Sequence, residues 1–401
     1  MVKPRHKILP NKIPTMKNIQ LFVPKFRKEE IQEHISVCLD RGWTGLGFKT
    51  VEIEDKWKEY TNLPFAHFIN SNTSGLHLAF KILKDANKWN DGDEIITSPL
   101  TFVSSNHAIV YENLKPVFAD VDEFLCLDPK SIESKITKKT KAILFIGIGG
   151  NTGQLNSVIE LAKKHKLKVI LDAAHMAGTF IKNPNTGQPE HVGHRVDVSV
   201  FSFQAVKNLP TADSGIICFN NEDYDTLVRK LSWLGIDKDT YQRTNDKGSY
   251  KWEYELVDVG YKYHGNSIMA SMALVGLKYL EEDNQRRRDI SEKYESELTQ
   301  HNIEVVTSHQ DCVKSSRHLF QIVVDDRNKF MELLNSSGVY PGVHYRDNTN
   351  YKMYNEQFGQ CPSSHFVSEK LISLPLHMYL TDEDVDYVIE QVIRINEILK
   401  K

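Results

Sequence analysis

The chain has 401 residues, 40% of them hydrophobic and 26% charged, which is enough to bury a large core and to form two domains. A formal net charge of −3 argues against a nucleic-acid or anionic-membrane surface, and the sequence contains no long apolar run or secretory signal core. The five cysteines form no C-x-x-C pair, so we expect reduced thiols, no metal site and a soluble, cytoplasmic protein.

Short apolar runs alternate with amphipathic stretches from about residue 65 to 220. The runs typical of strands are 64–70, 93–98, 116–122, 141–148, 168–172, 198–203 and 215–220. Apolar residues repeat at helical spacing between most of them, in 74–87, 103–113 and 155–165. This alternation predicts a mostly parallel sheet covered by helices on both faces, with ligands beyond the carboxyl ends of its strands.

The pattern changes after residue 265. A long helix is expected from Ile268 to Leu298, and the C-terminal helix should begin after Thr381, with Asp384 placed for a capping box. Between them lie the strand-like runs IEVVTS, HLFQIVVDD and LISLPLH and the helical run FMELLNSSG. We therefore predict a large domain with an N-terminal extension, residues 1–265, and a smaller α+β domain, residues 266–401.

Residues 141–175 first suggest a nicotinamide dinucleotide site, because an apolar run leads into glycines, a helix and a second run ending in an acid, Asp172. That fingerprint needs glycine at its first, third and sixth positions. Counted from Gly147, the third position is Gly149 but the sixth is Thr152, whose side chain would crowd the helix against the strand. The spacing therefore argues against a nicotinamide site.

Asp172 and Lys207 together indicate a different kind of cofactor site. Asp172 ends one predicted strand, and Lys207 follows the next, so both should emerge at the same sheet edge. A lysine in a loop is usually only a solvated cation, but a lysine and an acid at adjacent strand ends suit pyridoxal phosphate. The lysine would form the Schiff base, and the acid would hold the pyridinium proton.

The phosphate of such a cofactor needs hydrogen-bond donors. SNTSGLHLAF, residues 71–80, follows a strand and opens a helix, so it would offer backbone N–H groups at a positive helix end. Thr73 and Ser74 could add hydroxyls there or simply cap the helix, and Ser202 could add a third. Phe102 could stack on the cofactor ring or pack into the core.

Motifs along nearly the whole chain resemble one family in the correct order. They include GWTGLGFKTVEIEDKW, SNTSGLHLAF, TSPLTFVSS, KPVFADVD, LDAAHMAGT, FSFQAVKNLPTADSG, GYKYHGNSIMAS, GVHYRDNTNY and LISLPLHMYLTDEDVDYVIEQV. The family is that of the DegT/DnrJ/EryC1/StrS sugar aminotransferases, a branch of the fold-type-I pyridoxal phosphate enzymes. The resemblance implies their α/β fold, with a mostly parallel sheet between helices and a small C-terminal α+β domain.

The resemblance also implies roles for individual residues. Lys207 would form the internal aldimine, Asp172 would contact the pyridine nitrogen, and His175 would lie beside the ring's phenolic oxygen. Thr73, Ser74 and Ser202 would bind the phosphate, and Phe102 would stack on the ring. The segment GYKYHGNS is expected to cross a homodimer interface, so that its Lys262 would contribute to the active site of the partner subunit.

The sequence departs from the family in three places. Lys262 stands where asparagine is common, and His264 stands where arginine or asparagine is common. GIGGNTGQL replaces a histidine-containing turn, and residues 181–197 are long enough to form a surface excursion. From the small domain, His344, Tyr345 and Arg346 are expected to line the substrate pocket.

The implied reaction is transfer of an amino group from glutamate to a nucleotide-linked keto sugar, with the cofactor alternating between its pyridoxal and pyridoxamine forms. A 4-keto-6-deoxyhexose is the first expectation and a 3-keto sugar is the alternative, in amino-sugar synthesis for a surface polysaccharide or glycosylated metabolite. A dehydratase branch carries histidine in place of the imine lysine, so Lys207 argues against it. A cofactor-binding regulator without turnover is a further alternative.

Overall fold

The computed structural model describes residues 17–237 and 254–400. Its main sheet has seven strands in the order β1-β9-β8-β5-β4-β2-β3. All neighbours from β8 to β3 pair in parallel, whereas β9 is antiparallel to both β8 and β1. The mostly parallel sheet is thereby confirmed, with strands β1 (Phe65–Ile69), β2 (Glu94–Thr97), β3 (Lys115–Phe118), β4 (Thr140–Ile146), β5 (Lys168–Asp172), β8 (Val198–Ser202) and β9 (Gly215–Phe219).

Helices pack against this sheet and close the larger core. The expected helices are present, although α3 begins two residues early because the Ser71 hydroxyl caps it by accepting a hydrogen bond from the Ser74 N–H. The helices before and between the strands are α1 (Lys28–Asp40), α2 (Phe48–Thr61), α3 (Asn72–Asn87), α4 (Val103–Tyr111), α5 (Pro129–Lys135), α6 (Leu155–His165) and α7 (Glu222–Leu231). Short 3₁₀ turns are η1 (Ile148–Gly150), η2 (Val192–Arg195), η3 (Asn348–Asn350) and η4 (Lys352–Gln357).

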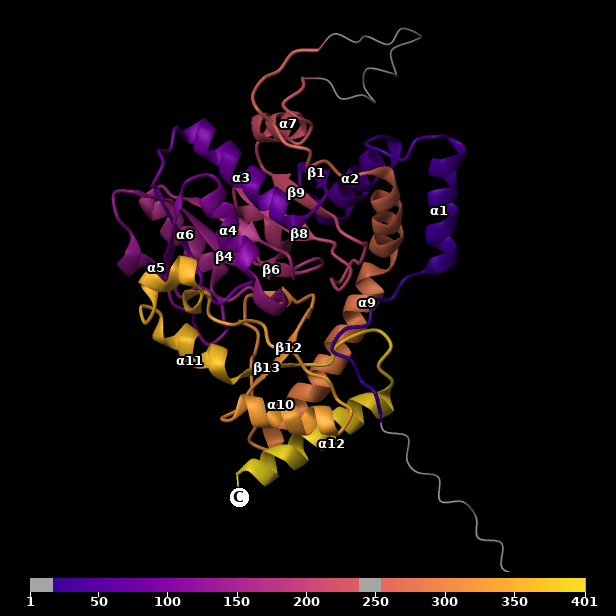
Figure 1. The fold of residues 1–401 in the computed structure, drawn as a ribbon, viewed down its shortest axis with the longest axis vertical. Helices are drawn as coiled ribbons and strands as arrows, with labels where there is room; N and C mark the ends of the chain where they lie inside the picture. The colour runs from indigo at the N-terminus through magenta and orange to yellow at the C-terminus, as the bar shows by residue number, and fades with distance from the viewer. Residues whose placement is uncertain (1–16, 238–253, 401) are drawn as a thin grey trace, which may run out of the picture.

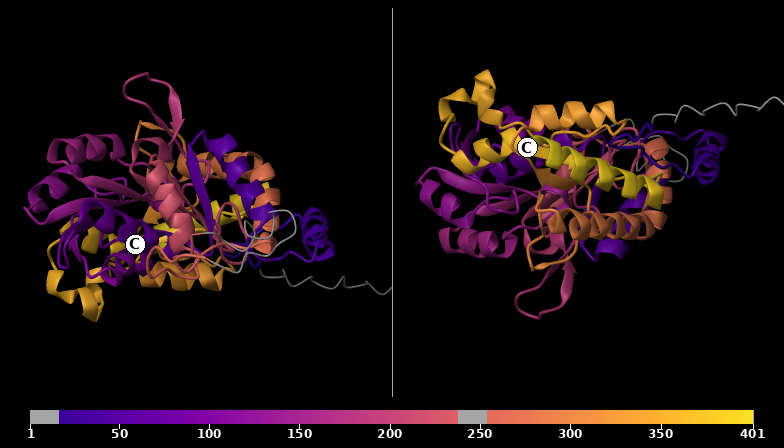
Figure 2. Two further views of the ribbon diagram at one scale, coloured as in Figure 1. Left: turned by 90° about the horizontal axis from the view of Figure 1, so that it is seen from above. Right: turned by 90° about the horizontal axis from the view of Figure 1, so that it is seen from below.

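The 34-residue helix α9 (Ser267–Gln300) joins two hydrophobic cores. Its first half contributes Leu274 to the large core, and its second half contributes Tyr294 to a second core that also contains Ile19. Figure 1 shows α9 running down to α10 and α12, and Figure 2 shows these helices across the lower end of the molecule. The division at residue 265 stays a prediction.

A three-stranded antiparallel sheet and two helices build the second core together with α9. They are β10 (Glu304–Val305), β12 (Phe320–Val323), β13 (Leu371–Leu374), α10 (Arg327–Ser336) and α12 (Asp382–Leu399). Helix α11 (Pro362–Lys370) packs Val367 against the large core instead. Thr381 caps α12, and the capping box with Asp384 is confirmed. The backbone near Ile19 pairs with Gly338 and Tyr340, which ties the N-terminal segment to this core.

The surface excursion expected at 181–197 is only partly exposed. It forms a hairpin of β6 (Phe180–Lys182) and β7 (Pro189–His191), and residues 184–189 at its tip are exposed. Strand β6 also pairs with β11 (Cys312–Lys314), so its base is buried between two distant parts of the chain.

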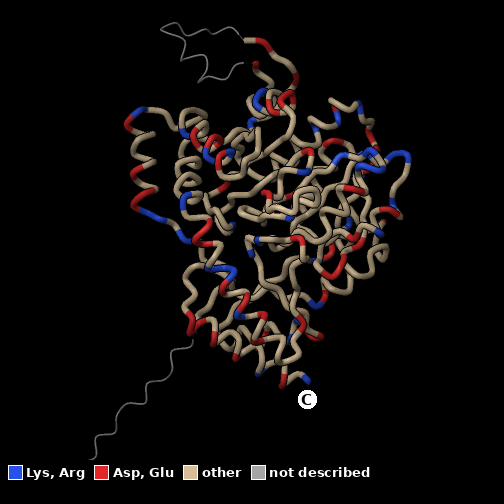
Figure 3. Tube along the Cα trace, turned by 180° about the vertical axis from the view of Figure 1, so that it is seen from behind, with Lys and Arg blue, Asp and Glu red and all other residues tan. Residues whose placement is uncertain are grey.

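Charged positions of both signs are spread along the chain (Figure 3), in keeping with the small net charge. Among the described residues, no helix combines the length and apolar character needed to cross a membrane. That part of the chain also contains no cluster of three or more histidine, cysteine, aspartate or glutamate side chains suited to a metal ion.

Gly75 tests how closely α3 packs on the sheet. A Cβ atom there would lie 2.4 Å from Ile69 Cδ1 and 2.5 Å from Val200 Cγ1. We expect Gly75→Ala to destabilise the protein by about 1–3 kcal/mol through overpacking, outweighing the better helix propensity of alanine. The midpoint of thermal unfolding measures this, with Gly45→Ala as control because no atom lies within 4 Å of a Cβ at Gly45. Equal midpoints for the two variants would contradict the tight contact.

Candidate active site

A cavity of about 410 Å³ opens beyond the carboxyl ends of β4, β5 and β8. Most of the predicted site residues lie in its wall: Thr73, Phe102, Asp172, His175, Ser202, Lys207, His344 and Tyr345. Ser74, Lys262 and Arg346 are outside it. The sheet therefore brings together residues from both ends of the chain in one site.

Asp172 is a buried carboxylate held by neutral donors. Its Oδ2 accepts a hydrogen bond from the Ser105 hydroxyl at 2.7 Å, and its Oδ1 accepts from the Ala174 N–H at 3.1 Å and from Asn72 Nδ2 at 3.3 Å. Burial raises the pKa of Asp172, whereas these hydrogen bonds and the charge of Lys207 oppose the rise. A cationic ligand group would match this carboxylate well.

Lys207 lies in the tight connection between β8 and the antiparallel β9. The connection is closed by a hydrogen bond from the Thr211 N–H to the Phe203 carbonyl at 2.8 Å. Burial lowers the pKa of Lys207 to about 8, although the charge of Asp172 opposes this change. A substantial fraction of the amine is therefore neutral near pH 8 and able to act as nucleophile or base.

The glycine-rich turn after β4 fixes the tautomer of His175. The Gly149 N–H donates to His175 Nδ1 at 3.1 Å, and Gly149 has a positive φ of 63°. Burial lowers the pKa of His175 well below its usual value, so the ring is neutral and its single proton lies on Nε2. Nε2 lies 3.1 Å from the Tyr345 hydroxyl oxygen, to which it donates.

The hydroxyl proton of Tyr345 is therefore free to point elsewhere. Burial and the nearby Asp172 raise the pKa of Tyr345, so its hydroxyl stays protonated. Because its oxygen accepts from His175 and the residue lines the cavity, Tyr345 can donate a hydrogen bond to a ligand.

Sequence reasoning missed His318, which faces the same cavity. Its Nδ1 lies 2.8 Å from Asn208 Oδ1, and Asn208 Nδ2 donates to Asn284 Oδ1 and to the Ser316 carbonyl. The Asn208 oxygen is thus an acceptor, which places the His318 proton on Nδ1 and leaves Nε2 as an acceptor.

Aromatic rings form one continuous wall of the cavity. Phe22 stacks on His318 at 5.4 Å, His318 lies 4.3 Å from His175, and the rings of His175 and Tyr345 are 6.1 Å apart. Phe102 continues the row at 6.1 Å from Tyr345, and its exposed fraction of 58% is high for a large aromatic residue. Phe102 is thus available to stack on a ligand.

The start of α3 supplies the expected polar end of the cavity, but Ser71 and Thr73 line it, not Ser74. The Ser74 hydroxyl donates to Asn70 Oδ1 at 2.6 Å and lies 2.8 Å from the Ser71 carbonyl. A phosphate role for Ser74 remains a prediction. Ser71 could have been found from its position, because serine immediately before a helical pattern is a typical N-cap.

Lys262 and Arg346 both lie on the surface. The Lys262 ammonium sits 3.2 Å from the centre of the Trp233 ring, and Arg346 lies over Tyr351 at 5.4 Å. Neither contacts the cavity of its own chain. Their predicted roles in binding are therefore not tested by a single chain.

The other residues that the sequence did not reveal come from the N-terminal segment and from two helix starts. Phe22 reaches the cavity because the N-terminal segment pairs with the second core, and Asn72 and Ser105 reach Asp172 from the first turns of α3 and α4. Ser105 was within a quoted motif, but no pattern distinguished it from its neighbours. No signal marked Phe22 or His318.

The fold is that of an α/β enzyme, and a buried lysine and a buried carboxylate line one cavity at the edge of its sheet. The family model described as "DegT/DnrJ/EryC1/StrS aminotransferase family" matches residues 25–393, so the chain belongs to this family of aminotransferases. The spore coat polysaccharide biosynthesis protein SpsC of Bacillus subtilis is 31% identical, over 98% of each chain.

Solved structures agree with this assignment. Spr1654 from Streptococcus pneumoniae in its PMP form superposes with a TM-score of 0.87 at 29% identity, covering 95% of this chain and 100% of that one. It is also known in a PLP form. PseC of Helicobacter pylori, an aminotransferase involved in the biosynthesis of pseudoaminic acid, gives a TM-score of 0.84 at 26% identity, over 95% and 100% of the chains.

The hydrogen bond from Ser105 to Asp172 can be tested through the pKa of Asp172. Since this hydrogen bond lowers the pKa of Asp172, Ser105→Ala should raise that pKa further above the ordinary aspartate value. Carbon NMR titration of labelled aspartate carboxyls in the cofactor-free protein measures this, with Asp172→Asn assigning the signal. Ser104→Ala is the control, because Ser104 lines the cavity without a hydrogen bond to Asp172. An unchanged titration in Ser105→Ala would show that the bond is unimportant.

Proposed function

We propose that this protein transfers an amino group from glutamate to a nucleotide-linked keto sugar, most simply a 4-keto-6-deoxyhexose. The observation that carries the proposal is the shared cavity of Lys207 and Asp172 at adjacent strand ends. The similarity to SpsC, named for polysaccharide biosynthesis, and to PseC, named for pseudoaminic acid biosynthesis, supports a sugar substrate. The substrates of this reaction are cytoplasmic metabolites, so we place the protein in the cytoplasm.

The cofactor is pyridoxal phosphate, and the cavity suits it. Asp172 is buried among neutral donors and would match a pyridinium N–H, while the start of α3 offers backbone N–H groups with Ser71, Thr73 and Ser202 nearby for the phosphate. Phe102 is exposed to the cavity and can stack on the ring. When bound, pyridoxal phosphate accepts electron pairs from the carbon that loses its proton and carries the amino group between substrates.

Lys207 and Asp172 divide the proton chemistry. The Lys207 amine is neutral above about pH 8, so it can remove the proton from the α-carbon of the donor and deliver it again. Three hydrogen bonds hold the Asp172 carboxylate in one orientation, in which it would stabilise a proton on the pyridine nitrogen of the bound cofactor. Tyr345, oriented by His175, is placed to donate to a ligand oxygen.

We further propose a homodimer whose active sites are shared. Lys262 lies outside its own cavity and on the surface, as a residue serving a second chain would. Beside its segment, Leu234, Leu256, Val257 and Val259 are exposed by 45%, 64%, 46% and 82%. Such a group of exposed apolar side chains is typical of a protein interface. Lys262 can meet an anionic group of the partner's ligand as a point charge.

Replacing Lys207 tests the function directly. We expect Lys207→Ala to reduce turnover by at least about 100-fold, because the general base is lost, and to remove the absorbance band of the lysine imine, because the amine that forms it is lost. The assay couples 2-oxoglutarate formation from glutamate to candidate nucleotide-linked 4-keto and 3-keto sugars, and NMR of the product locates the new amine. A wild-type protein that binds the cofactor but turns over none of these sugars would favour a regulator, and an active, coloured Lys207→Ala variant would refute the assignment of Lys207.

The lowered pKa of Lys207 predicts how the cofactor-free protein reacts. Only the neutral amine attacks an aldehyde, so the rate of pyridoxal phosphate incorporation should rise with pH and level off above a midpoint near 8. Stopped-flow absorbance from pH 6 to pH 11 measures this as a rise of about tenfold per pH unit below the midpoint, or about 100-fold between pH 6 and pH 8. A midpoint near 10.5, the ordinary lysine value, would show that burial does not lower the pKa.

A further inference from the structure

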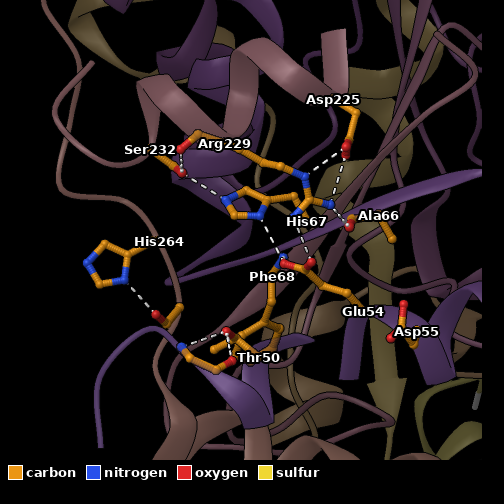
Figure 4. A network of polar contacts seen from close by, with 12 residues as sticks. Thr50, Glu54, Asp55, Ala66, His67, Phe68, Asp225, Arg229, Ser232 and His264 are labelled. Carbon is orange, nitrogen blue, oxygen red and sulfur yellow. Dashed lines mark hydrogen bonds and ion pairs between the residues drawn. The ribbon is translucent and has the colours of Figure 1, made fainter. Parts of the chain in front are cut away.

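Two buried histidine–glutamate pairs flank the segment of residues 261–265, which carries Lys262. In the first pair, His67 Nδ1 of β1 donates to Glu54 Oε1 of α2 at 2.9 Å, and His67 Nε2 lies 2.8 Å from the Ser232 hydroxyl (Figure 4). His67 and Glu54 are only 3% and 5% exposed. Neither residue has a part in the cavity, so this network calls for another role.

Arg229 keeps Glu54 of the first pair ionised. Its Nη1 donates to Glu54 Oε2 at 2.8 Å, and its Nε donates to Asp225 Oδ2 at 2.8 Å (Figure 4). Burial acts to raise the pKa of Glu54, but the charges of Arg229 and His67 lower it to about 2. The carboxylate is therefore a permanent acceptor that holds His67 in place.

Ser232 connects His67 to the segment of residues 261–265 through hydrogen bonds. The Ser232 carbonyl accepts from the Tyr263 N–H at 2.9 Å and from the His264 N–H at 3.2 Å. On the opposite edge, the Asn70 N–H donates to the Tyr263 carbonyl at 2.8 Å. The segment is thus held like a strand between two parts of the large core.

The second pair holds the side chains of the same segment. His77 Nε2 lies 2.8 Å from Glu112 Oε1, and His77 Nδ1 lies 3.2 Å from the Tyr263 hydroxyl. The Tyr261 hydroxyl donates to Glu112 Oε1 at 3.2 Å. His77 and Glu112 are 7% and 9% exposed, so this pair is also buried.

Extended backbone sends alternate side chains to opposite faces. Tyr261 and Tyr263 stack 4.9 Å apart on the face of the second pair. Lys262 and His264 lie on the other face, where both rest against Trp233. Fixing the two tyrosines and the backbone therefore fixes where Lys262 emerges.

We propose that His67 and His77 are positioning residues that set the register of residues 261–265 and so deliver Lys262 to the active site of a second copy of this chain. This inference rests on the proposed shared dimer. It predicts that damage to either histidine impairs the neighbouring site while leaving the site of its own chain competent.

Mixed dimers test that prediction. His67→Ala and Lys207→Ala should each be nearly inactive alone, but a mixture of the two should regain about a quarter of wild-type activity, since half of the dimers then contain one complete site. His77→Ala should behave in the same way. The matched control is His191→Ala, because His191 is also buried but lies outside both networks. Mixing this variant with Lys207→Ala should give only the average of the two separate activities.

A second combination separates this inference from the proposed function. Lys262→Ala mixed with Lys207→Ala should also regain activity if the sites are shared, and failure of that pair would overturn the shared dimer. Success of that pair together with failure of the His67→Ala mixture would overturn the positioning role.

Hydrogen–deuterium exchange gives a readout that needs no activity. In His67→Ala, the amides of residues 260–267 should exchange at least about five-fold faster than in the wild type, without a similar change in β4 or β5. Where His67→Ala fails to fold, the milder Ser232→Ala and Tyr263→Phe variants remove single links of the two networks. Unchanged exchange of this segment in all of these variants would refute the proposal.

Discussion

The site depends on a carboxylate and an amine that are both removed from water at one edge of the sheet. Asp172 is stabilised by neutral donors from three different elements, and burial still raises its pKa, while burial lowers the pKa of Lys207. Neither group reaches its ordinary charge state easily without a ligand between them. A ring with a protonated nitrogen at one end and an electrophilic carbon at the other relieves both costs, which is why the pair suits pyridoxal phosphate.

The two histidines beside Lys207 are uncharged. Burial holds the pKa values of His175 and His318 well below normal, so two aromatic residues line the cavity without adding positive charge next to Lys207. Their hydrogen bonds give them opposite roles, because His175 donates through Nε2 whereas His318 accepts there. The glycine-rich turn after β4, which first suggested a dinucleotide site, holds both histidines. The Gly149 N–H donates to the His175 ring, and the Gly149 carbonyl accepts from the backbone N–H of His318.

Ionised networks outside the cavity concern orientation more than stability. Glu54 and Asp225 are buried and both pair with the partly exposed Arg229, so loss of Arg229 would leave two buried carboxylates without their cation. This cluster matters for orientation, because its hydrogen bonds hold His67, Ser232 and the segment of residues 261–265 that pairs with Ser232. The same logic applies to His77 and Glu112 on the opposite side.

The order of the elements was determined by the sequence alone, since period-2 and period-3.6 patterns are local and strands such as Lys168–Asp172 end where their apolar run ends. That order was enough to place Asp172 and Lys207 at one sheet edge. The tertiary structure decided what local patterns do not encode: the antiparallel direction of β9, the entry of Phe22 and His318 into the cavity, and the exclusion of Ser74 from it. The direction of β9 and the entry of Phe22 and His318 depend on contacts between residues far apart in the chain, such as His318 with Asn208, and no periodicity in the sequence reports them. The exclusion of Ser74 depends on a local hydrogen bond to Asn70, which the hydrophobic pattern does not report either.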